Sequence, residues 1–393
     1  MDPRTNPYAP GAGSPPPELA GRDGILSDAR VALQRTIDGR PAKGQMLLGL
    51  RGVGKTVLLN RILEIAEEEG FHTVLIEAPE NKTLPELLVP PLRSVLFRLN
   101  RSKKIRHGAR QALRTLRSFA SAFKVSVGEV EFGVEAEVGS ADSGDLNADL
   151  PELLLAVGAA AREGETAIAL LIDEVQYLSD RDLSALIAAI HKVTQRSQPV
   201  IFFGAGLPQL AALAGEAKSY AERLFDYPFV GPLEPADARA ALQEPAERQG
   251  VAYEHVALEH IVATTQGYPY FLQEWGKHVW DAAAASPITK GDAVQATERA
   301  VRQLDTGFFR VRLDRLAPRE KDYVRAMAAL GAGPHRSGDI ARQLGMSVNQ
   351  AAPLRDKLIR KGMIYSPAHG DTAFTVPMFD EFMRRSIPDP PGV

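Results

Sequence analysis

The run from Leu47 to Thr56 constrains the fold of this chain more than any other feature. Its last eight residues read Gly-Leu-Arg-Gly-Val-Gly-Lys-Thr and satisfy the pattern G-x-x-x-x-G-K-S/T. An apolar run, Met46 to Leu50, predicts a strand before the turn, and an amphipathic stretch, Val57 to Glu68, predicts a helix after it. Strand, glycine-rich turn and helix in this order predict a loop that binds phosphate.

Each residue type in this loop has an expected role. Glycines let the backbone curl so that successive N–H groups face a phosphate, and the following helix adds partial positive charge. Lys55 is expected to reach the β- and γ-phosphates, and the Thr56 hydroxyl to join the shell of Mg²⁺. The alternative is a glycine-rich turn before an ordinary helix, but all the parts are in register. The predicted contacts with ATP are Gly49, Gly52, Val53, Gly54, Lys55 and Thr56.

A second nucleotide signal lies at Ile168 to Glu174. Five apolar residues predict a buried parallel strand, and Asp173 and Glu174 follow at its carboxyl end, where ligands bind in such sheets. Asp173 is placed to hold Mg²⁺, directly or through water, and Glu174 to polarise an attacking water. A strand that ends in a solvated acidic turn would look similar, but this one follows the phosphate loop by about one domain length.

Composition narrows the class of protein. At 393 residues the chain can form two or three domains, and the absence of cysteine excludes disulfides, thiolate catalysis and cysteine-ligated zinc. No apolar run approaches the roughly 18 residues of a membrane helix, so we expect no membrane association. Residues 1–17 read as a disordered, proline-rich leader without the apolar core of a signal peptide. A cytoplasmic protein is expected.

Strand and helix signals alternate in residues 18–233, which predicts an α/β P-loop NTPase core with a parallel sheet and helices on both faces. Residues 100–150 interrupt this alternation as an insertion. Its first half reads as a basic helix, and residues 129–138 alternate in polarity like half-exposed strands. The predicted strands are Met46–Leu50, His72–Glu77, Ala167–Ile172, Val200–Phe203 and Tyr227–Val230.

Two further domains are predicted after the core. Residues 234–310 read as an all-helical lid. Residues 316–387 read as helix, helix, turn, helix and hairpin, the order of a winged helix-turn-helix. Pro353 falls in the part of the last helix that usually enters the DNA groove. It either disrupts the first turns or moves the start of the helix to about Ala352, so we expect little base reading.

Charge is segregated along the chain, although the net charge of −3 argues against a general nucleic-acid coat. Residues 93–124 hold ten lysines and arginines and no acid, whereas residues 129–149 hold seven acids and no base. Residues 316–387 hold eleven basic residues against seven acids. Segment 93–124 and the winged helix are therefore candidate DNA contacts. In the winged helix the basic residues on or after the predicted recognition helix are Arg355, Lys357, Arg360 and Lys361.

The order of phosphate loop, Asp-Glu strand, helical lid and winged helix resembles the AAA+ and STAND families of P-loop ATPases. Origin-recognition initiators and NB-ARC-like switches are the most similar in layout, and the resemblance covers Leu19 to Met383. It implies that Gly21 and Arg22 lie near adenine and that Pro269, in Gly267-Tyr268-Pro269, contacts the nucleotide from the lid. It also implies that Arg223, in Glu222-Arg223-Leu224-Phe225, is an arginine finger in a homo-oligomer, although a surface arginine in an ordinary helix fits the spacing equally well.

Two departures from these families bear on activity. Phe202 to Gly206 offers only backbone where AAA+ proteins end the fourth strand in a polar sensor, and Pro269 stands in place of a lid arginine. Both suggest that hydrolysis is slow or needs a partner. The sequence therefore predicts an ATPase whose nucleotide state controls a winged helix that acts on DNA. The alternatives are a STAND-type switch that acts on a protein partner, a winged helix that only locks the ATPase, and a basic segment neutralised by the acids that follow it.

Overall fold

The computed structural model describes residues 1–11, 13, 16–79, 81–100, 106–125, 132–137 and 139–387. The chain divides into two compact units, and residues of the phosphate loop fall in both of them. The α/β unit comprises Arg22–Gly49 and Lys55–Val230, and the helical unit comprises Met1–Gly21, Leu50–Gly54 and Gly231–Val393.

Within the described residues, the sheet of the α/β unit consists of β1 Gly44–Leu48, β2 Phe71–Glu77, β3 Ala167–Asp173, β4 Val200–Gly206 and β5 Phe225–Asp226. All neighbours are parallel, in the order β2-β3-β4-β1-β5. The parallel sheet predicted from the sequence is confirmed, although β4 is longer than predicted and β5 lies earlier. Because β1 and β3 both flank β4, their carboxyl ends reach the same edge of the sheet.

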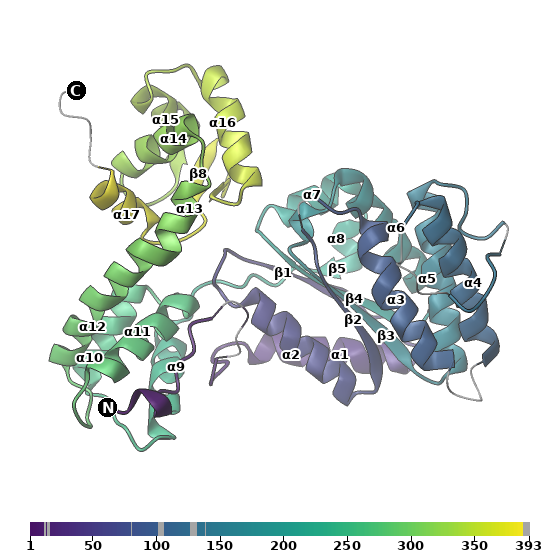
Figure 1. The fold of residues 1–393 in the computed structure, drawn as a ribbon, viewed down its shortest axis with the longest axis horizontal. Helices are drawn as coiled ribbons and strands as arrows, with labels where there is room; N and C mark the ends of the chain where they lie inside the picture. The colour runs from purple at the N-terminus through teal and green to yellow at the C-terminus, as the bar shows by residue number, and fades with distance from the viewer. Residues whose placement is uncertain are drawn as a thin grey trace. The chain divides into compact units, whose positions relative to one another are not determined.

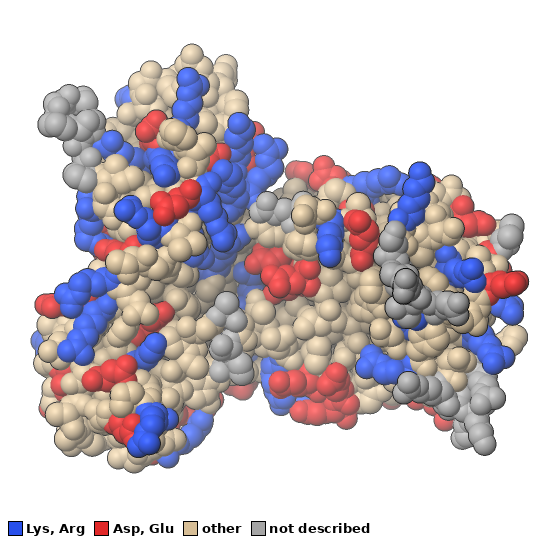
Figure 2. Space-filling model, viewed as in Figure 1, with Lys and Arg blue, Asp and Glu red and all other residues tan. Residues whose placement is uncertain are grey.

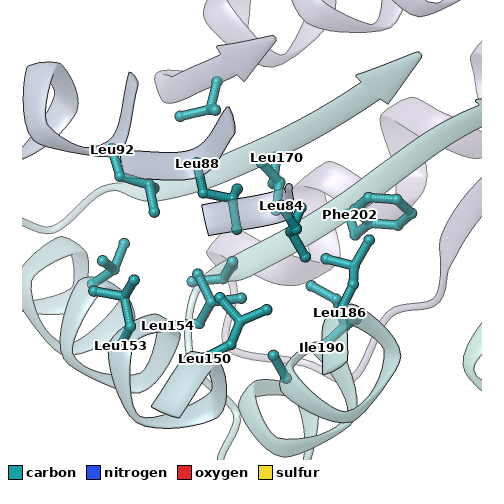
Figure 3. Packing of buried hydrophobic residues seen from close by; sticks show 14 of the residues in the cluster. Leu84, Leu88, Leu92, Leu150, Leu153, Leu154, Leu170, Leu186, Ile190 and Phe202 are labelled. Atoms are coloured by element: carbon teal, nitrogen blue, oxygen red, sulfur yellow. The ribbon is translucent and has the colours of Figure 1, made fainter. Parts of the chain in front are cut away.

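Helices cover both faces of this sheet (Figure 1). On one face lie α1 Asp23–Ile37 and α2 Lys55–Glu68, and on the other α3 Leu84–Asn100, α5 Leu146–Glu163 and α6 Asp180–Gln195. Strands β1, β3 and β4 are buried along their whole length, which explains their nearly continuous apolar sequences. Figure 3 shows leucines of α3 and α5 packed with Leu170, Leu186 and Phe202 in the core between sheet and helices.

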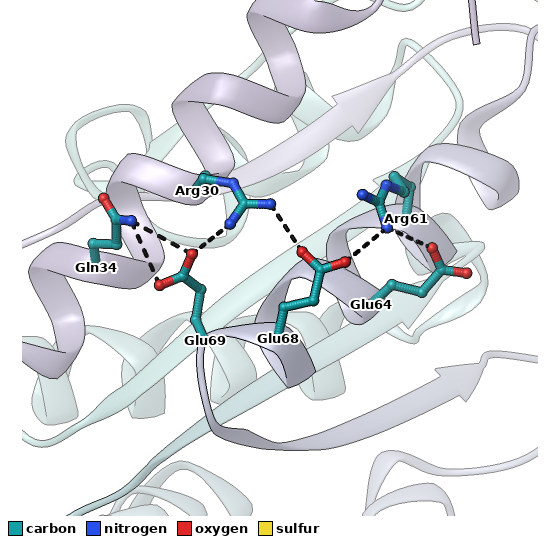
Figure 4. A network of polar contacts seen from close by, with 6 residues as sticks. All are labelled: Arg30, Gln34, Arg61, Glu64, Glu68 and Glu69. Carbon is teal, nitrogen blue, oxygen red and sulfur yellow. Dashed lines mark hydrogen bonds and ion pairs between the residues drawn. The ribbon is translucent and has the colours of Figure 1, made fainter. Parts of the chain in front are cut away.

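Charged side chains form a network between α1 and the end of α2, the two helices on one face of the sheet (Figure 4). Arg30 of α1 contacts Glu69 at 2.5 Å and Glu68 at 2.9 Å, and Glu68 also contacts Arg61 at 3.2 Å. Such partly exposed pairs contribute at most about 1 kcal/mol each, so burial of the apolar faces dominates this contact.

The insertion forms a helix and an irregular segment. Helix α4, Arg106–Ala122, packs against α3 and α5. The predicted strands are not found among the described residues 132–137, and the other residues of that prediction lie outside the described chain. The reason is that this segment bonds to α4 instead of to a strand: Ser118 Oγ donates to the Glu137 carbonyl at 2.7 Å and accepts its N–H at 2.9 Å.

The helical unit contains residues 234–310, the segment predicted to be an all-helical lid. Its helices are α9 Pro235–Glu247, α10 His255–Thr265, α11 Pro269–Ala282 and α12 Lys290–Gln303. Helix α12 runs without a break into a π-helix, Leu304–Phe309, and then into α13, Arg310–Asp314. A π-helical turn inside a longer helix is rare and is frequent at functional sites. This continuous helix joins the lid to the rest of the unit.

The C-terminal domain follows this helix and contains the three helices and the hairpin expected from the sequence, together with a short strand, β6 His335–Arg336, and a final helix, α17 Phe379–Ser386, that were not predicted. The expected elements are α14 Pro318–Ala329, α15 Ser337–Gln343, α16 Val348–Arg360, β7 Ile364–Tyr365 and β8 Asp371–Phe374. The three strands form an antiparallel sheet in the order β6-β8-β7. Helix α16 does not start at Ala352, because a Ser347–Gln350 capping box fixes its first turn and Pro353 lies inside it.

The leader differs from its prediction, since its described residues are anchored on the lid helices. Tyr8 is 4% exposed, and its hydroxyl donates to the carbonyl of Leu242 in α9. The indole N–H of Trp280 in α11 donates to the carbonyl of Asp2 at 2.9 Å. Composition indicated disorder because residues 1–17 are rich in proline, but one buried tyrosine and a few hydrogen bonds suffice to dock such a segment.

Candidate active site

The phosphate loop leaves β1 and adopts backbone angles that explain its glycines. The N–H of Gly49 donates to the carbonyl of Gly206 at 3.1 Å, which fixes the start of the loop at the end of β4. Gly52 and Gly54 have φ values of 85° and 94°, a region that side chains disfavour. The turn therefore has the tight curl that backbone recognition of a phosphate requires.

Helix α2 begins at Lys55, directly after the last glycine of the loop. The N–H groups of Lys55 and Thr56 thus belong to the first helical turn, which has no intrahelical acceptors and carries the positive end of the helix dipole. Lys55 is 6% exposed, so its charge is held close to the protein instead of extending into solvent. Both features favour an anion at this position.

The two nucleotide signals of the sequence meet inside the α/β unit. The Thr56 hydroxyl lies 2.6 Å from Oδ2 of Asp173 and donates to it, although 117 residues separate them. Oδ1 of Asp173 accepts the N–H of Glu174 at 2.8 Å, so both carboxylate oxygens have a partner. The predicted metal residues, Thr56 and Asp173, are therefore neighbours.

Burial raises the pKa of Asp173, and the negative charge of Glu174 acts in the same direction. The hydrogen bond from Thr56 and the charge of Lys55 act against this rise. A hydroxyl and a carboxylate are the hard oxygen ligands that Mg²⁺ prefers, and an ion with several waters needs only one or two such protein ligands. The donor set fits Mg²⁺, although the described residues contain no cluster of three or more His, Cys, Asp or Glu side chains for a protein-only site.

Glu174 follows β3 in a left-handed conformation with φ of 54°, which is uncommon for a residue other than glycine. Its carboxylate accepts a hydrogen bond from Gln176 Nε2, while Oε1 of Gln176 accepts the N–H of Leu207 at 3.1 Å. Sequence reasoning missed Gln176, because a glutamine in a turn carries no motif. A Cβ on Gly206 would lie 2.6 Å from Gln176 Oε1, so Gln176 occupies the space next to the end of β4.

The residues expected near adenine belong to different units. Gly21 lies in the helical unit with φ of 68°, and a Cβ there would lie 2.4 Å from Oδ2 of Asp237. Arg22 precedes α1 in the α/β unit as its N-cap residue. The positive φ favours glycine here independently of any ligand, and the adenine role of both residues stays a prediction.

Pro269 occupies the first position of α11, as expected for a proline that follows a helix cap. The preceding Gly267 pairs with Leu233, whose N–H donates to its carbonyl at 2.8 Å. The tyrosines on either side of Pro269 contact the phosphate loop, which the sequence did not indicate. Tyr268 donates its hydroxyl to the Arg51 carbonyl, and the N–H of Tyr270 donates to the Gly52 carbonyl at 3.2 Å.

Arg223 lies in the short helix α8, Ala221–Leu224, and is exposed. Within the described parts of the chain, its side chain makes no hydrogen bond or ion pair. This placement fits both an arginine finger and an ordinary surface residue, so the structure leaves both predictions open.

Two of the four basic residues on or after the predicted recognition helix are already bonded within the domain. Arg355 donates to Thr372 Oγ1 at 3.0 Å and to Ser366 Oγ at 2.9 Å, which ties α16 to the hairpin. Burial acts to raise the pKa of Glu320, but its 2.6 Å pair with Lys361 and the N–H of Ala317 lower this pKa overall. The residues of this cluster without a hydrogen bond or ion pair to the described chain are Lys357 and Arg360.

The basic helix α4 presents Arg110, Arg114 and Arg117 on one exposed face. Arg117 donates to the carbonyl of Val134 in the irregular segment. Among described residues no ion pair joins these arginines to the acids that follow, and Glu129 and Glu131 lie outside the described residues. The side chains of residues 101–106, which belong to the predicted basic segment, lie outside the described structure.

None of the described helices is long and apolar enough to cross a membrane.

Comparison with known proteins agrees with this geometry. Residues 18–203 match the family described as AAA ATPase domain, and residues 306–383 match one described as a domain of unknown function. No curated protein matches the sequence. The solved Walker-type ATPase of Pyrococcus abyssi superposes with a TM-score of 0.60 at 18% identity, over 93% of this chain and 96% of that one.

Two other solved structures are less similar. Orc1 of Aeropyrum pernix, solved in complex with DNA, has a TM-score of 0.47 at 14% identity and covers 94% of this chain and 93% of its own. The RuvB Holliday junction branch migration motor of Thermotoga maritima has a TM-score of 0.46 at 15% identity, over 90% and 92% of the two chains.

Proposed function

We propose that this chain, whose residues 18–203 form an AAA ATPase domain of the P-loop class, hydrolyses ATP and uses its nucleotide state to control the C-terminal domain on DNA. The observation that carries the proposal is the 2.6 Å hydrogen bond between Thr56 and Asp173. It joins the helix that follows the phosphate loop to the acidic end of β3, as a metal-dependent phosphoryl site requires.

In this proposal the N–H groups of loop 49–56 hold the phosphates, and Lys55 neutralises the charge of the β- and γ-phosphates. Thr56 and Asp173 hold Mg²⁺, which when bound offsets the negative charge of the triphosphate. Glu174 orients the attacking water and accepts its proton as general base. Gly21 and Arg22 contribute at the adenine and Pro269 at the lid, as the family resemblance implies.

Two features support slow or stimulated turnover. Strand β4 ends in Gly206, so the polar sensor of related ATPases is replaced by backbone and by the Gln176 side chain. Gln176 also donates to one oxygen of the Glu174 carboxylate, which fixes the orientation of the group and leaves the other oxygen for a water. A partner that brings this carboxylate into line with the attacking water would raise the rate. Arg223 from a neighbouring subunit is our candidate for one such contribution.

Action on DNA is supported by charge alone. Lysines and arginines gather on the C-terminal domain (Figure 2), whose residues 316–387 include eleven of them against seven acids. Lys357 and Arg360 at the end of α16, together with Arg110 and Arg114 of α4, are the proposed phosphate contacts. Pro353 within α16 and the engagement of Arg355 by the hairpin argue for backbone contacts over base reading.

An ATPase assay with and without duplex DNA tests the whole proposal. We expect slow turnover that requires Mg²⁺ and is altered at least several-fold by DNA. Turnover without any response to DNA, combined with no DNA binding at low salt, would support the alternative of a switch that acts on a protein partner. No ATP binding at all would overturn both functions.

A further inference from the structure

The phosphate loop offers two sets of backbone groups, and a phosphate uses only one of them. Anions are bound by N–H groups, so the carbonyl oxygens of the same residues stay available to the protein. In the helical unit, the carbonyl of Arg51 accepts the Tyr268 hydroxyl, and the carbonyl of Gly52 accepts the Tyr270 N–H at 3.2 Å. The start of α11 thus bonds to carbonyl groups of the loop, whereas the expected phosphate contacts are the N–H groups of the loop.

The contact between the start of α11 and the loop is close and buried. Tyr268 is 1% exposed, and a Cβ on Gly52 would lie 3.0 Å from its Cε1 and 3.3 Å from Cβ of Tyr270. Burial raises the pKa of Tyr268 well above its usual value, so the hydroxyl remains a hydrogen-bond donor at all physiological pH. The N–H of Tyr270 lies in the first turn of α11, where a helix has no acceptor of its own, and the loop carbonyl supplies one.

From Tyr270 a row of aromatic rings leads to the C-terminal domain. Tyr270 stacks on Phe308 of the π-helix at 4.9 Å between centroids, and the neighbouring Phe309 stacks on Phe382 of α17 at 5.3 Å. A second contact reaches the same domain directly, because a Cβ on Gly362, after α16, would lie 2.6 Å from a terminal nitrogen of Arg51. The loop is therefore in contact with both α11 and the C-terminal domain.

We propose that Tyr268 is a positioning residue that shapes the phosphate loop through its carbonyl oxygens and passes nucleotide occupancy to α11 and the C-terminal domain. This inference rests on the proposed nucleotide site. A phosphate that orders the N–H side of the peptide units also fixes the direction of their carbonyls, since each peptide unit is planar. Loss of the tyrosine hydroxyl therefore lowers nucleotide affinity. It also reduces the change that bound nucleotide causes in α11.

The sequence provides a reporter for this test, because its two tryptophans, Trp275 and Trp280, both lie in α11. The full chain is titrated with ATP and with ADP in Mg²⁺, following tryptophan emission and, separately, heat of binding. Three variants are compared with the parent: Tyr268→Phe, Lys55→Ala and Tyr8→Phe. The last is a matched control, since it removes a buried tyrosine hydroxyl that bonds Leu242 in the same unit away from the loop.

We expect nucleotide to change tryptophan emission in the parent and in Tyr8→Phe. In Tyr268→Phe we expect affinity to fall by about 2- to 10-fold, the effect of one hydrogen bond, and the emission change at saturation to be largely lost. Lys55→Ala is expected to lose the heat of binding altogether. Hydrogen exchange of the parent adds a measurement without a variant: nucleotide should slow exchange of the Tyr270 amide.

Parental affinity and a full emission change in Tyr268→Phe would overturn the inference while leaving the nucleotide site intact. Unchanged exchange at Tyr270 on saturation would do the same. If the parent binds no nucleotide, or if Lys55→Ala binds as the parent does, the proposed function itself fails and this inference fails with it.

Discussion

The Thr56 hydroxyl and the Asp173 carboxylate are joined by a 2.6 Å hydrogen bond between the first turn of α2 and the end of β3. Strand order produces this contact, because β1 and β3 are separated only by β4 and run parallel to it. Residues that follow their carboxyl ends therefore meet at one edge of the sheet. The pair places a hydroxyl and a buried carboxylate next to the first turn of α2, the turn that also carries Lys55.

Lys55→Ala should abolish ATP binding and leave the fold intact. Lys55 is the positive side chain of the phosphate motif, and its replacement removes a charge without disturbing the first turn of α2, since alanine is a good helix former. Affinity is measured by calorimetry and folding by thermal melting. Arg61→Ala, a neighbour on the same helix that pairs with Glu64 and Glu68, is the matched control and should bind as the parent does.

Glu174→Gln should bind ATP normally and hydrolyse it about 10²- to 10⁴-fold more slowly, because a general base is lost while Asp173 remains. Gln176→Ala should act in the opposite direction or leave the rate unchanged, since it frees the Glu174 carboxylate from its hydrogen bond. Single-turnover rates at saturating ATP distinguish these outcomes. Parental turnover in Glu174→Gln would remove this residue from the proposed mechanism.

Asp173→Asn should melt at a higher temperature than the parent in the absence of nucleotide. The folded-state pKa of Asp173 is raised by burial, so the native state binds more protons than the unfolded state and stability falls as pH rises through this range. The free-energy cost of burying the Asp173 carboxylate is fully present at neutral pH, where the group is charged. It disappears below the pKa that Asp173 has in the unfolded chain.

Melting curves between pH 4 and pH 8 check this sign. The stabilisation by Asp173→Asn should shrink as the pH falls, and the variant should lose Mg²⁺-dependent ATP affinity over the whole range. Equal melting temperatures at neutral pH would show that neighbouring donors fully offset the burial of the carboxylate.

Much of this site followed from the sequence, because its main parts are local. The turn glycines, Lys55 and the start of α2 lie within eight consecutive residues, and the apolar strand before Asp173 is equally compact. Four of the five predicted strands overlap observed ones, chiefly because buried parallel strands have nearly continuous apolar sequences, whereas the fifth was placed after the two-residue strand β5. The order of the strands in the sheet could not be predicted, since nothing in the sequence of a single strand specifies its neighbours.

What escaped sequence reasoning depends on contacts between distant segments. The tyrosines beside Pro269 contact a loop more than 200 residues earlier, and Gln176 bridges Glu174 to the residue after β4. The leader was expected to be disordered, yet Tyr8 is buried against α9 and α11. Residues 132–137 alternate like a strand but bond to α4, because polarity alone does not name the partner.

If Arg223 is an arginine finger, ATPase activity per subunit should rise with protein concentration. Its exposed position on α8 leaves the side chain available to another copy of the chain. Arg223→Ala should be inactive alone but regain turnover when mixed with Lys55→Ala, because one competent interface can form between them. Activity that is independent of concentration, without rescue in the mixture, would make Arg223 an ordinary surface residue.

DNA binding should fall steeply with salt if the free basic residues contact phosphates, by about 0.9 in log affinity per contact for each unit of log salt. Removing Lys357 and Arg360 together, or Arg110 and Arg114 together, should each reduce this slope by about two. Sequence preference should be weak before and after, because these contacts reach only the backbone.

Two controls separate charge from folding in this experiment. Arg302→Ala removes an exposed charge outside both regions and should leave the slope unchanged. Arg355→Ala should instead lower the melting temperature, since this side chain ties α16 to Thr372 and Ser366 of the hairpin. Fluorescence anisotropy with ATP, with ADP and without nucleotide measures all of these slopes. A flat salt response in every nucleotide state would contradict phosphate contacts at both regions and favour a protein partner for the C-terminal domain.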